Sequence, residues 1–235
     1  MKIVLAPNAL KGSCTASSAA AAMAAGIARV LPDADLVQVP VADGGDGLAD
    51  VVTHVLRARS RRFRVSGPRF DSVNAELAWL ADSRTAFIEM ALASGLALLA
   101  KPERDPTATT TFGTGELIRH ALELGAKKLV VGIGGSATND GGVGMAAALG
   151  YRFVDVAGQP IVPVGANLAL IDRINADHVD RRLAGLRIEA ICDVDNPLTD
   201  PDDGPPAGNP DGACAIPADA GLADARLAAA GLADA

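Results

Sequence analysis

The run GIGGSATNDGGVG at residues 132–144 constrains this chain more than any other feature, because it places glycines and polar side chains between an apolar strand pattern and an apolar helix pattern. Glycines let backbone N–H groups turn toward an anion with no Cβ in the way, and a helix N-terminus adds a favourable dipole. The alternative is a structural turn whose polar side chains cap the next helix. The run is richer in glycine than a cap requires, so it predicts a phosphate-binding loop.

The composition indicates a globular protein that does not bind nucleic acid or membranes. Of 235 residues, 49% are hydrophobic and 3% are aromatic, so we expect a core of Ala, Val, Leu and Ile in one large domain or two small ones. The net charge of −7 opposes adhesion to nucleic acid and to anionic membranes. Cys14, Cys192 and Cys214 form no CxxC pair, which favours a reducing, cytoplasmic setting without a zinc site.

Strand and helix patterns alternate at the N-terminus and then give way to consecutive strands. The first four elements are expected at residues 3–6, 15–31, 36–39 and 48–59. Their order favours a parallel sheet with both strand-end loops at one edge, where open α/β sheets bind ligands. Three strands expected at residues 61–65, 73–80 and 85–90 favour antiparallel pairing, so the change near residue 60 predicts a second domain. Further helices are expected at residues 114–124 and 143–149, and further strands at 128–131, 151–154 and 187–192.

Two loops at the predicted sheet edge carry side chains suited to phosphate chemistry. Lys11 follows the first strand, where a lysine either neutralises a carboxylate or phosphate or is simply solvated. Asp43 and Asp46 surround paired glycines after the second strand. These carboxylates could hold Mg²⁺ or accept a proton from a substrate hydroxyl. The alternative is a tight turn in which Asp46 caps the helix that begins at residue 48.

Two more acidic positions lie on or after predicted strands. Asp193 follows the strand at residues 187–192, and an acid at the ligand-binding edge explains it better than a calcium loop, whose glycine and terminal glutamate are absent. Glu89 lies on an apolar strand, where a carboxylate facing a core needs a partner. The sequence does not decide between a structural and a functional role for Glu89.

The glycine run also matches a dinucleotide-binding fingerprint. Gly132, Gly134 and Ala137 fit the G-x-G-x-x-A pattern, and Asp155 lies at roughly the distance of a ribose-binding acid. Against this interpretation, the Asn139-Asp140 pair puts a carboxylate where bare amides should meet a pyrophosphate. An NAD(P)-binding oxidoreductase therefore stays an alternative to a phosphate site that uses a metal.

Taken together, these segments resemble the bacterial glycerate kinases of the type related to glycerate 2-kinase. The resemblance rests on MKIVLAPNALKGS, PVADGGDG, IEMALASGL, TFGTGELI, GIGGSATNDGGVGMAAALGYRFVD and CDVDNPL, in that order. These long motifs cover about residues 1–200 and make the resemblance specific. It implies phosphorylation of D-glycerate by ATP, with Mg²⁺, to 2-phosphoglycerate or 3-phosphoglycerate.

The resemblance also implies a two-domain α/β fold and a set of cleft residues. A flavodoxin-like parallel-sheet domain would include residues 1–60, and a mixed α/β domain at residues 61–200 would be inserted into it. We assign catalysis to Lys11, Asp43 and Asp193, substrate binding to Lys11, Ser13 and Asn196, and metal binding to Asp46 and Asp140. Phosphate or nucleotide binding is expected from Gly134, Gly135, Ser136, Thr138, Asn139, Gly141 and Gly142.

Residues 201–235 depart from the family pattern. Family members continue after the DNPL motif into a glycine-rich segment similar to VFGPQKG, where this chain has DPDDGPPAGNPDGACAIPADAG and then an Ala-rich helix pattern at about residues 219–234. This departure indicates a truncation or a frameshift that leaves the first domain incomplete, with an exposed sheet edge. The chain is then either a kinase of reduced activity or an inactive kinase remnant.

Overall fold

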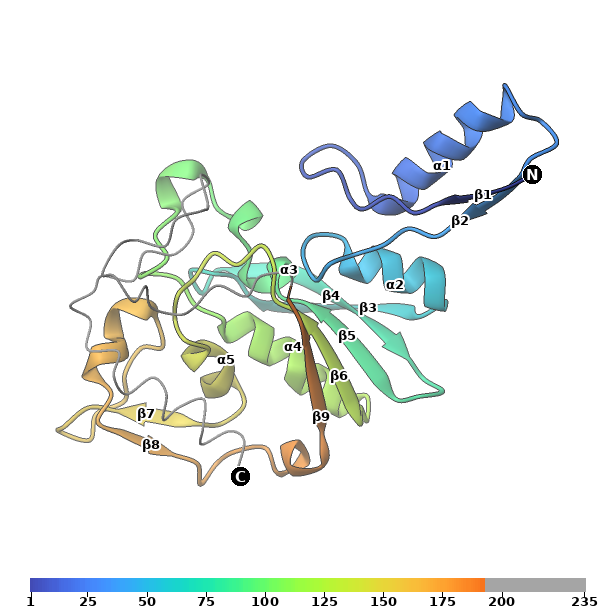
Figure 1. Cartoon of the computed structure of the whole chain (residues 1–235). Helices are drawn as coiled ribbons and strands as arrows, with labels where there is room; N and C mark the ends of the chain where they lie inside the picture. The colour runs from blue at the N-terminus through green and yellow to red at the C-terminus, as the bar shows by residue number, and fades with distance from the viewer. Residues whose placement is uncertain (193–235) are drawn as a thin grey trace, which may run out of the picture.

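The structure, a computed structural model, describes residues 1–192, and a five-stranded mixed sheet forms its centre (Figure 1). The strand order is β3-β4-β5-β6-β9. The strands are β3 (Arg59–Ser66), β4 (Ser72–Leu80), β5 (Thr85–Glu89), β6 (Lys128–Gly132) and β9 (Arg187–Ile191). The first three pair in antiparallel fashion, as predicted, whereas β5, β6 and β9 are parallel. The α/β class predicted from the sequence is therefore confirmed.

Helices cover both faces of this sheet. Successive side chains of a strand point to opposite faces, so Leu77 and Ala78 of β4 belong to two different hydrophobic clusters. Helix α4 (Phe112–Glu123) packs with the larger cluster, in which Leu117 is fully buried. Helix α2 (Leu48–Leu56) packs with the smaller one on the other face. The sheet thus lies between two helical layers and is held rigid from both sides.

A small unit at the N-terminus stands beside this three-layer arrangement (Figure 1). Strand β1 (Lys2–Leu5) pairs in parallel with β2 (Asp35–Gln38), as predicted, and α1 (Ala16–Ala28) connects them. The hydroxyl of Thr15 caps α1 by accepting a hydrogen bond of 3.2 Å from the backbone N–H of Ser18. The loops that leave β1 and β2 therefore emerge at the same edge of this pair.

Helix α2 connects the N-terminal unit with the large sheet. It ends at Leu56, three residues before its predicted end, because Arg57 adopts a left-handed conformation with φ 55° and the chain turns into β3. Although α2 follows β2 in the sequence, it packs on β4 and β5. The hydroxyl of Ser17 on α1 donates a hydrogen bond of 2.8 Å to Asp50 on α2. The division into domains 1–60 and 61–200 stays a prediction.

Short elements complete the described chain. Helix α5 (Val143–Ala148) packs tightly on α4 at Gly115, where a Cβ would lie 2.3 Å from the carbonyl oxygen of Met145. The remaining elements are α3 (Ala91–Ser94), α5 (Val143–Ala148), the antiparallel pair β7 (Arg152–Val154) and β8 (Arg173–Asn175), and 3₁₀ turns at Leu96–Leu98, Lys101–Glu103, Gly165–Leu170 and Arg181–Gly185. Within residues 1–192, none of the helices has the length and apolar character needed to cross a membrane. The predicted helix at residues 219–234 lies outside the described residues.

Candidate active site

Three segments from distant parts of the chain meet at one edge of the large sheet. The parallel register aligns Glu89, Gly132 and Ile191, so β5, β6 and β9 all end at this edge. The loop after β2 lies against the loop after β6, because the N–H of Gly134 donates a hydrogen bond of 3.0 Å to the carbonyl oxygen of Gly44. The N–H of Ile133 donates to Ile191 at 3.2 Å, which joins the end of β9 to the same group.

Glycines make this close approach possible. A Cβ on Gly132 would lie 2.5 Å from the carbonyl oxygen of Gly44, and one on Gly134 would lie 2.6 Å from the Cα of Gly45. Gly44 has φ +97°, and its Cβ would lie 2.4 Å from the carbonyl oxygen of Ile191. Gly44, Gly132 and Gly134 therefore let the loop after β2 pack on the loop after β6. The sequence alone did not distinguish this packing role from phosphate binding.

Hydrogen bonds within the protein already occupy several of the backbone amides predicted to bind phosphate. Gly134 donates to Gly44, Thr138 to the hydroxyl of Ser136, Asn139 to the carbonyl of Pro106, and Gly142 to Asp140. Among residues 1–192, the amides of Gly135, Ser136 and Gly141 make no such bond. Gly135 is exposed and has φ +71°. The phosphate-binding prediction thus narrows to these three amides.

Asp140 is the centre of a buried hydrogen-bond network. The residue is only 1% exposed. One carboxylate oxygen accepts from the N–H of Thr111 at 2.7 Å, its hydroxyl at 2.8 Å and the N–H of Gly144 at 3.1 Å; the other accepts from the N–H of Gly142 at 2.9 Å. The hydroxyl of Thr110 lies 3.3 Å from the first of these oxygens and donates at 2.7 Å to the carbonyl oxygen of Pro163. These donors surround both oxygens, so the carboxylate has a structural role in this loop, and metal binding by Asp140 stays a prediction.

The threonines that hold this network were missed in the sequence. Thr109, Thr110 and Thr111 are all buried although they precede a helix in a loop. The hydroxyl of Thr109 donates 2.7 Å to the carbonyl of Ala137, and the hydroxyl of Thr138 donates 2.8 Å back to the carbonyl of Thr109. A run of three threonines before a helix was the available signal, because hydroxyls can satisfy backbone groups that a loop would otherwise bury unpaired.

Asp46 is the predicted metal ligand that does lie beside the open amides. An ideal Cβ on Gly135 would be 3.0 Å from its Oδ1 atom, and the residue is exposed. It does not cap α2, whose N-cap residue Gly47 lacks a side-chain cap. Mg²⁺ is commonly bound by one or two carboxylates together with phosphate oxygens and waters, and Asp46 next to Gly135 fits that pattern. In the part of the chain that the structure describes, no three His, Cys, Asp or Glu residues gather as a metal cluster.

A hydrogen bond links the loop that carries Lys11 to the loop that carries Asp43. The side-chain amide of Asn8 donates to Asp43 Oδ2 at 2.7 Å, and the N–H of Gly45 donates to Oδ1 at 3.1 Å. Lys11 and Ser13 are exposed in the loop between β1 and α1. Asn8 was not among the predicted site residues, although it stands in the quoted N-terminal motif. The Asn8 contact joins the two loops together with a backbone hydrogen bond of 3.0 Å from the N–H of Val41 to the carbonyl oxygen of Pro7.

The same contacts set the acidity of Asp43. The N–H of Gly45 lowers the pKa of the Asp43 carboxyl most, and the amide of Asn8 lowers it further. A carboxyl whose pKa is lower in the folded state contributes stability above its ordinary pKa, and that contribution is lost as the pH falls through the lowered value. Asp43 therefore stays ionised at neutral pH, as both a proton acceptor and a cation-binding group require.

Replacing Asn8 by alanine is expected to raise the pKa of Asp43, because the ionised carboxylate loses one of its hydrogen-bond donors. A ¹³C NMR titration of the aspartate carboxyl carbons measures this directly. The matched control is Asn175→Ala, which removes a similar bond of 2.8 Å to Asp177 elsewhere on the surface. An unchanged Asp43 titration in Asn8→Ala, or an equal change in the control, would show that the two loops are not coupled through Asn8.

The predicted residues Asp193 and Asn196 lie outside the described residues, which end at Cys192. Strand β9 is nevertheless formed as predicted, and its last residue, Ile191, contacts the Gly44 loop. The roles of Asp193 and Asn196 stay predictions.

The geometry of the glycine run does not support the dinucleotide alternative. In that fingerprint the helix opens within the glycine motif, and its N-terminus receives the pyrophosphate. Here α5 begins only at Val143, and the amide of Gly134 is bonded to Gly44. Asp155, the expected ribose-binding acid, instead accepts hydrogen bonds from the N–H groups of Ala157 and Gln159 in an exposed turn.

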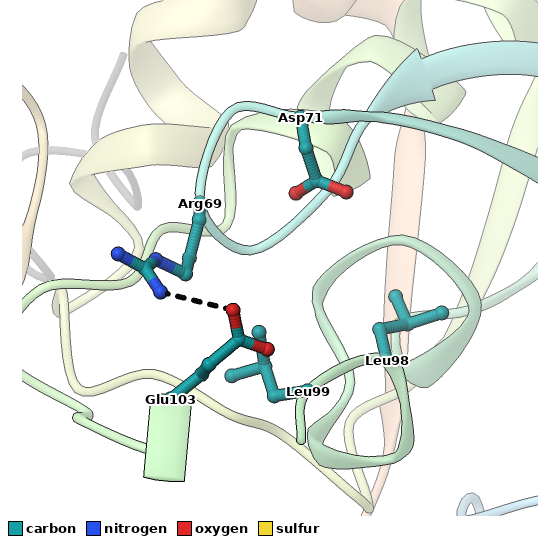
Figure 2. Close-up of a pocket in the computed structure, with 5 residues that line it drawn as sticks. All are labelled: Arg69, Asp71, Leu98, Leu99 and Glu103. Atoms are coloured by element: carbon teal, nitrogen blue, oxygen red, sulfur yellow. Dashed lines mark hydrogen bonds and ion pairs between the residues drawn. The ribbon is translucent and has the colours of Figure 1, made fainter.

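An open pocket of about 420 Å³ lies beside the turn between β3 and β4. Figure 2 shows that Arg69 and Glu103 approach each other across it, with an ion pair of 3.3 Å, while Asp71 stands on the same turn as Arg69. Leu98 and Leu99 complete its lining. None of the site residues predicted from the sequence lines this pocket. Arg69, the arginine of its lining, is paired with Glu103.

Comparisons with known proteins show the family of this chain. The family model described as the glycerate kinase family matches residues 3–205. A glycerate kinase of Bacillus subtilis (strain 168) is 47% identical over 201 residues, which are 86% of this chain and 53% of that protein. A glycerate 2-kinase of Escherichia coli (strain K12) is 47% identical over 198 residues, which are 84% of this chain and 52% of that protein.

A solved structure gives the same result for the fold. A crystal structure from Salmonella typhimurium LT2, provisionally designated glycerate kinase 2, superimposes with a TM-score of 0.75 at 46% identity and covers 85% of this chain and 54% of that one. The chain thus spans about half the length of the relatives that it matches. On the extent of the family match and the level of identity, the chain belongs to the glycerate kinase family.

Proposed function

We propose that this chain carries a phosphoryl-transfer site that uses ATP to phosphorylate a hydroxyl group of D-glycerate, giving 2-phosphoglycerate or 3-phosphoglycerate. Family membership supports the reaction class, and the contacts between the loops support the choice of site residues. The chain spans about half the length of its relatives, so the whole activity is itself part of the proposal. We place this activity in the cytoplasm, as the cysteine pattern favours.

The observation that carries the proposal is the contact between the two glycine loops. The hydrogen bond from Gly134 to Gly44 lays the Asp43–Gly47 loop on the loop after β6. It brings the Asp46 carboxylate beside Gly135, while the Asn8–Asp43 bond brings the Lys11 loop to the same place. A cation, two carboxylates and open backbone amides are the parts that phosphoryl transfer needs, because positioning and electrostatic stabilisation carry most of its catalysis.

The proposed role of each residue follows from the negative charge that shifts during phosphoryl transfer. The open amides of Gly135 and Ser136 would donate to phosphate oxygens, and Lys11 would neutralise either the carboxylate of glycerate or the phosphoryl group. The attacking hydroxyl oxygen forms a bond to the γ-phosphorus as the bond to the β-phosphate oxygen breaks, and ADP leaves. The hydroxyl proton would pass to Asp43 or Asp193. Asp46 is the residue that would hold Mg²⁺, which supplies positive charge against the phosphate oxygens.

Replacing Lys11 by alanine is expected to lower glycerate-dependent formation of ADP by about a hundredfold, because a charge close to the reacting groups is lost. A coupled assay of ADP release with and without D-glycerate measures this effect. The control is Lys2→Ala, which removes a lysine of the same N-terminal unit that pairs with Asp35 at 3.6 Å. Equal turnover in the Lys11 variant and the wild type would remove Lys11 from the site.

A further inference from the structure

Glu89 is a buried carboxylate for which the proposed reaction has no direct use. It ends β5 at the edge where the site lies, and it is 4% exposed. Its Oε1 atom accepts from the N–H of Gly47 at 3.0 Å, and its Oε2 atom accepts from the N–H of Ala49 at 3.1 Å. Both amides belong to the first turn of α2, whose N-terminal N–H groups have no partner within the helix. A residue of the neighbouring sheet therefore caps this helix.

This cap determines what the preceding loop can do. An aspartate at the start of a helix often caps it, and this was the alternative role considered for Asp46. Because Glu89 takes the amides of Gly47 and Ala49, the carboxylate of Asp46 is free to lie beside Gly135. Gly47 itself has φ +93°, which turns the chain from the loop into the helix. The Glu89 contact fixes the last residue of the Asp43–Gly47 loop and thus its position over the glycine run.

Opposing effects act on the pKa of the Glu89 carboxyl. Burial raises the pKa of the Glu89 carboxyl, the N–H groups of Gly47 and Ala49 lower it, and the charges of Asp46 and Glu76 raise it further. The folded chain keeps this proton to higher pH than the unfolded chain. Its contribution to stability is therefore complete below the ordinary glutamate pKa and is lost as the pH rises through the raised value.

We infer that Glu89 is a positioning residue, whose carboxylate caps α2 and so holds the Asp43–Gly47 loop, with Asp43 and Asp46, in register with the open amides of Gly135 and Ser136. Only the kinetic consequence of this inference rests on the proposed function. The positional consequence concerns the loop itself and is measured without any substrate.

Glu89→Gln keeps the shape of the side chain but turns an NH₂ group toward one of the two amides. The matched control is Glu116→Gln, because Glu116 also accepts a hydrogen bond from a backbone amide, that of Ser66 at 2.6 Å, and lies on α4 away from the loop. In Glu89→Gln, hydrogen exchange of the amides of Gly47, Ala49 and Gly134 is expected to quicken by about tenfold or more. The strands β3 and β4 should keep their protection in both variants.

The kinetic part of the experiment separates positioning from general stability. Glu89→Gln is expected to lower kcat by roughly tenfold with little change in KM for glycerate, since the loop groups act on the transferring phosphoryl group. Glu89→Asp, which keeps a carboxylate, should recover part of kcat and part of the exchange protection. Glu116→Gln should change neither kcat nor the exchange of the loop.

The outcomes are distinguishable. Wild-type exchange rates in both Glu89 variants overturn the inference, whatever the activity. Faster loop exchange with unchanged kcat also overturns it, because the loop would then not need its position. If the wild-type protein itself forms no ADP, the proposed function fails, and the exchange rates alone decide whether Glu89 positions the loop. If Glu89→Gln does not fold, the comparison rests on Glu89→Asp.

Discussion

Replacing Gly44 by alanine is expected to destabilise the fold by about 4 kcal/mol and to separate the two loops of the site. Gly44 has φ +97°, a conformation that costs an alanine energy wherever it occurs. In addition, the new Cβ would lie 2.4 Å from the carbonyl oxygen of Ile191 and 2.7 Å from its Cγ2 atom. The first of these is a backbone atom of a sheet strand, so the loop rather than the strand has to move. Urea unfolding followed by circular dichroism measures the loss.

The chain offers a control that separates the two causes. Gly12 has φ +71°, yet no atom lies within 4 Å of an added Cβ. Gly12→Ala is therefore expected to cost only the conformational strain, roughly 1 kcal/mol. If the two variants lose the same stability, the collision with Ile191 does not occur, and the close contact of the Gly44 loop with the end of β9 is not as described.

Replacing Asp140 by asparagine is expected to cost about 3 kcal/mol of stability. The substitution keeps the size of the side chain but places an NH₂ group among donors, namely the N–H groups of Thr111, Gly142 and Gly144 and the hydroxyl of Thr111. Buried donors left without an acceptor pay their full desolvation cost. The loop that joins residues 109–111 to the glycine run should then open, which hydrogen exchange of Gly142 and Gly144 would report.

Asp155 provides the matched control for this variant. It also accepts two backbone hydrogen bonds, from Ala157 at 2.9 Å and Gln159 at 2.8 Å, but in an exposed turn. Water can replace those bonds, so Asp155→Asn should cost less than about 1 kcal/mol. Mg²⁺ added to the wild-type protein should leave the NMR signals of Asp140 and its partners unchanged. Equal costs for both variants, or a Mg²⁺ effect at Asp140, would contradict the structural role.

The sequence was sufficient for the features that depend on local patterns. Three consecutive strand-like segments with short turns between residues 61 and 90 predicted the three antiparallel strands, and the strand–helix–strand order predicted the parallel pair β1–β2. The boundaries were less certain, because they depend on single residues: α2 ends where Arg57 adopts a positive φ, which no local pattern required. Gly44 was correctly placed in the loop after the second strand, but its contact with Ile191 could not be foreseen.

The contacts that local sequence could not reveal all join residues far apart in the chain. Asp140 is predicted as a metal ligand, and the structure adds that its carboxylate is held by Thr111, 29 residues away. Asp46 was considered as the cap of α2, and the actual cap is Glu89, 42 residues from Gly47. A carboxylate in a polar turn has the same local sequence whether it binds a metal or a backbone amide. Only the fold decides which donors it meets.

The most direct test of the proposed activity is ³¹P NMR of the purified protein with ATP, Mg²⁺ and D-glycerate. We predict that a phosphate monoester signal of phosphoglycerate appears in the same amount as ADP, that both require glycerate, and that both form about a hundredfold more slowly in Lys11→Ala. The position of the monoester resonance then distinguishes 2-phosphoglycerate from 3-phosphoglycerate. Unchanged ATP in the presence of folded protein, or conversion of ATP to ADP and inorganic phosphate without glycerate, would contradict the account and favour an inactive kinase remnant.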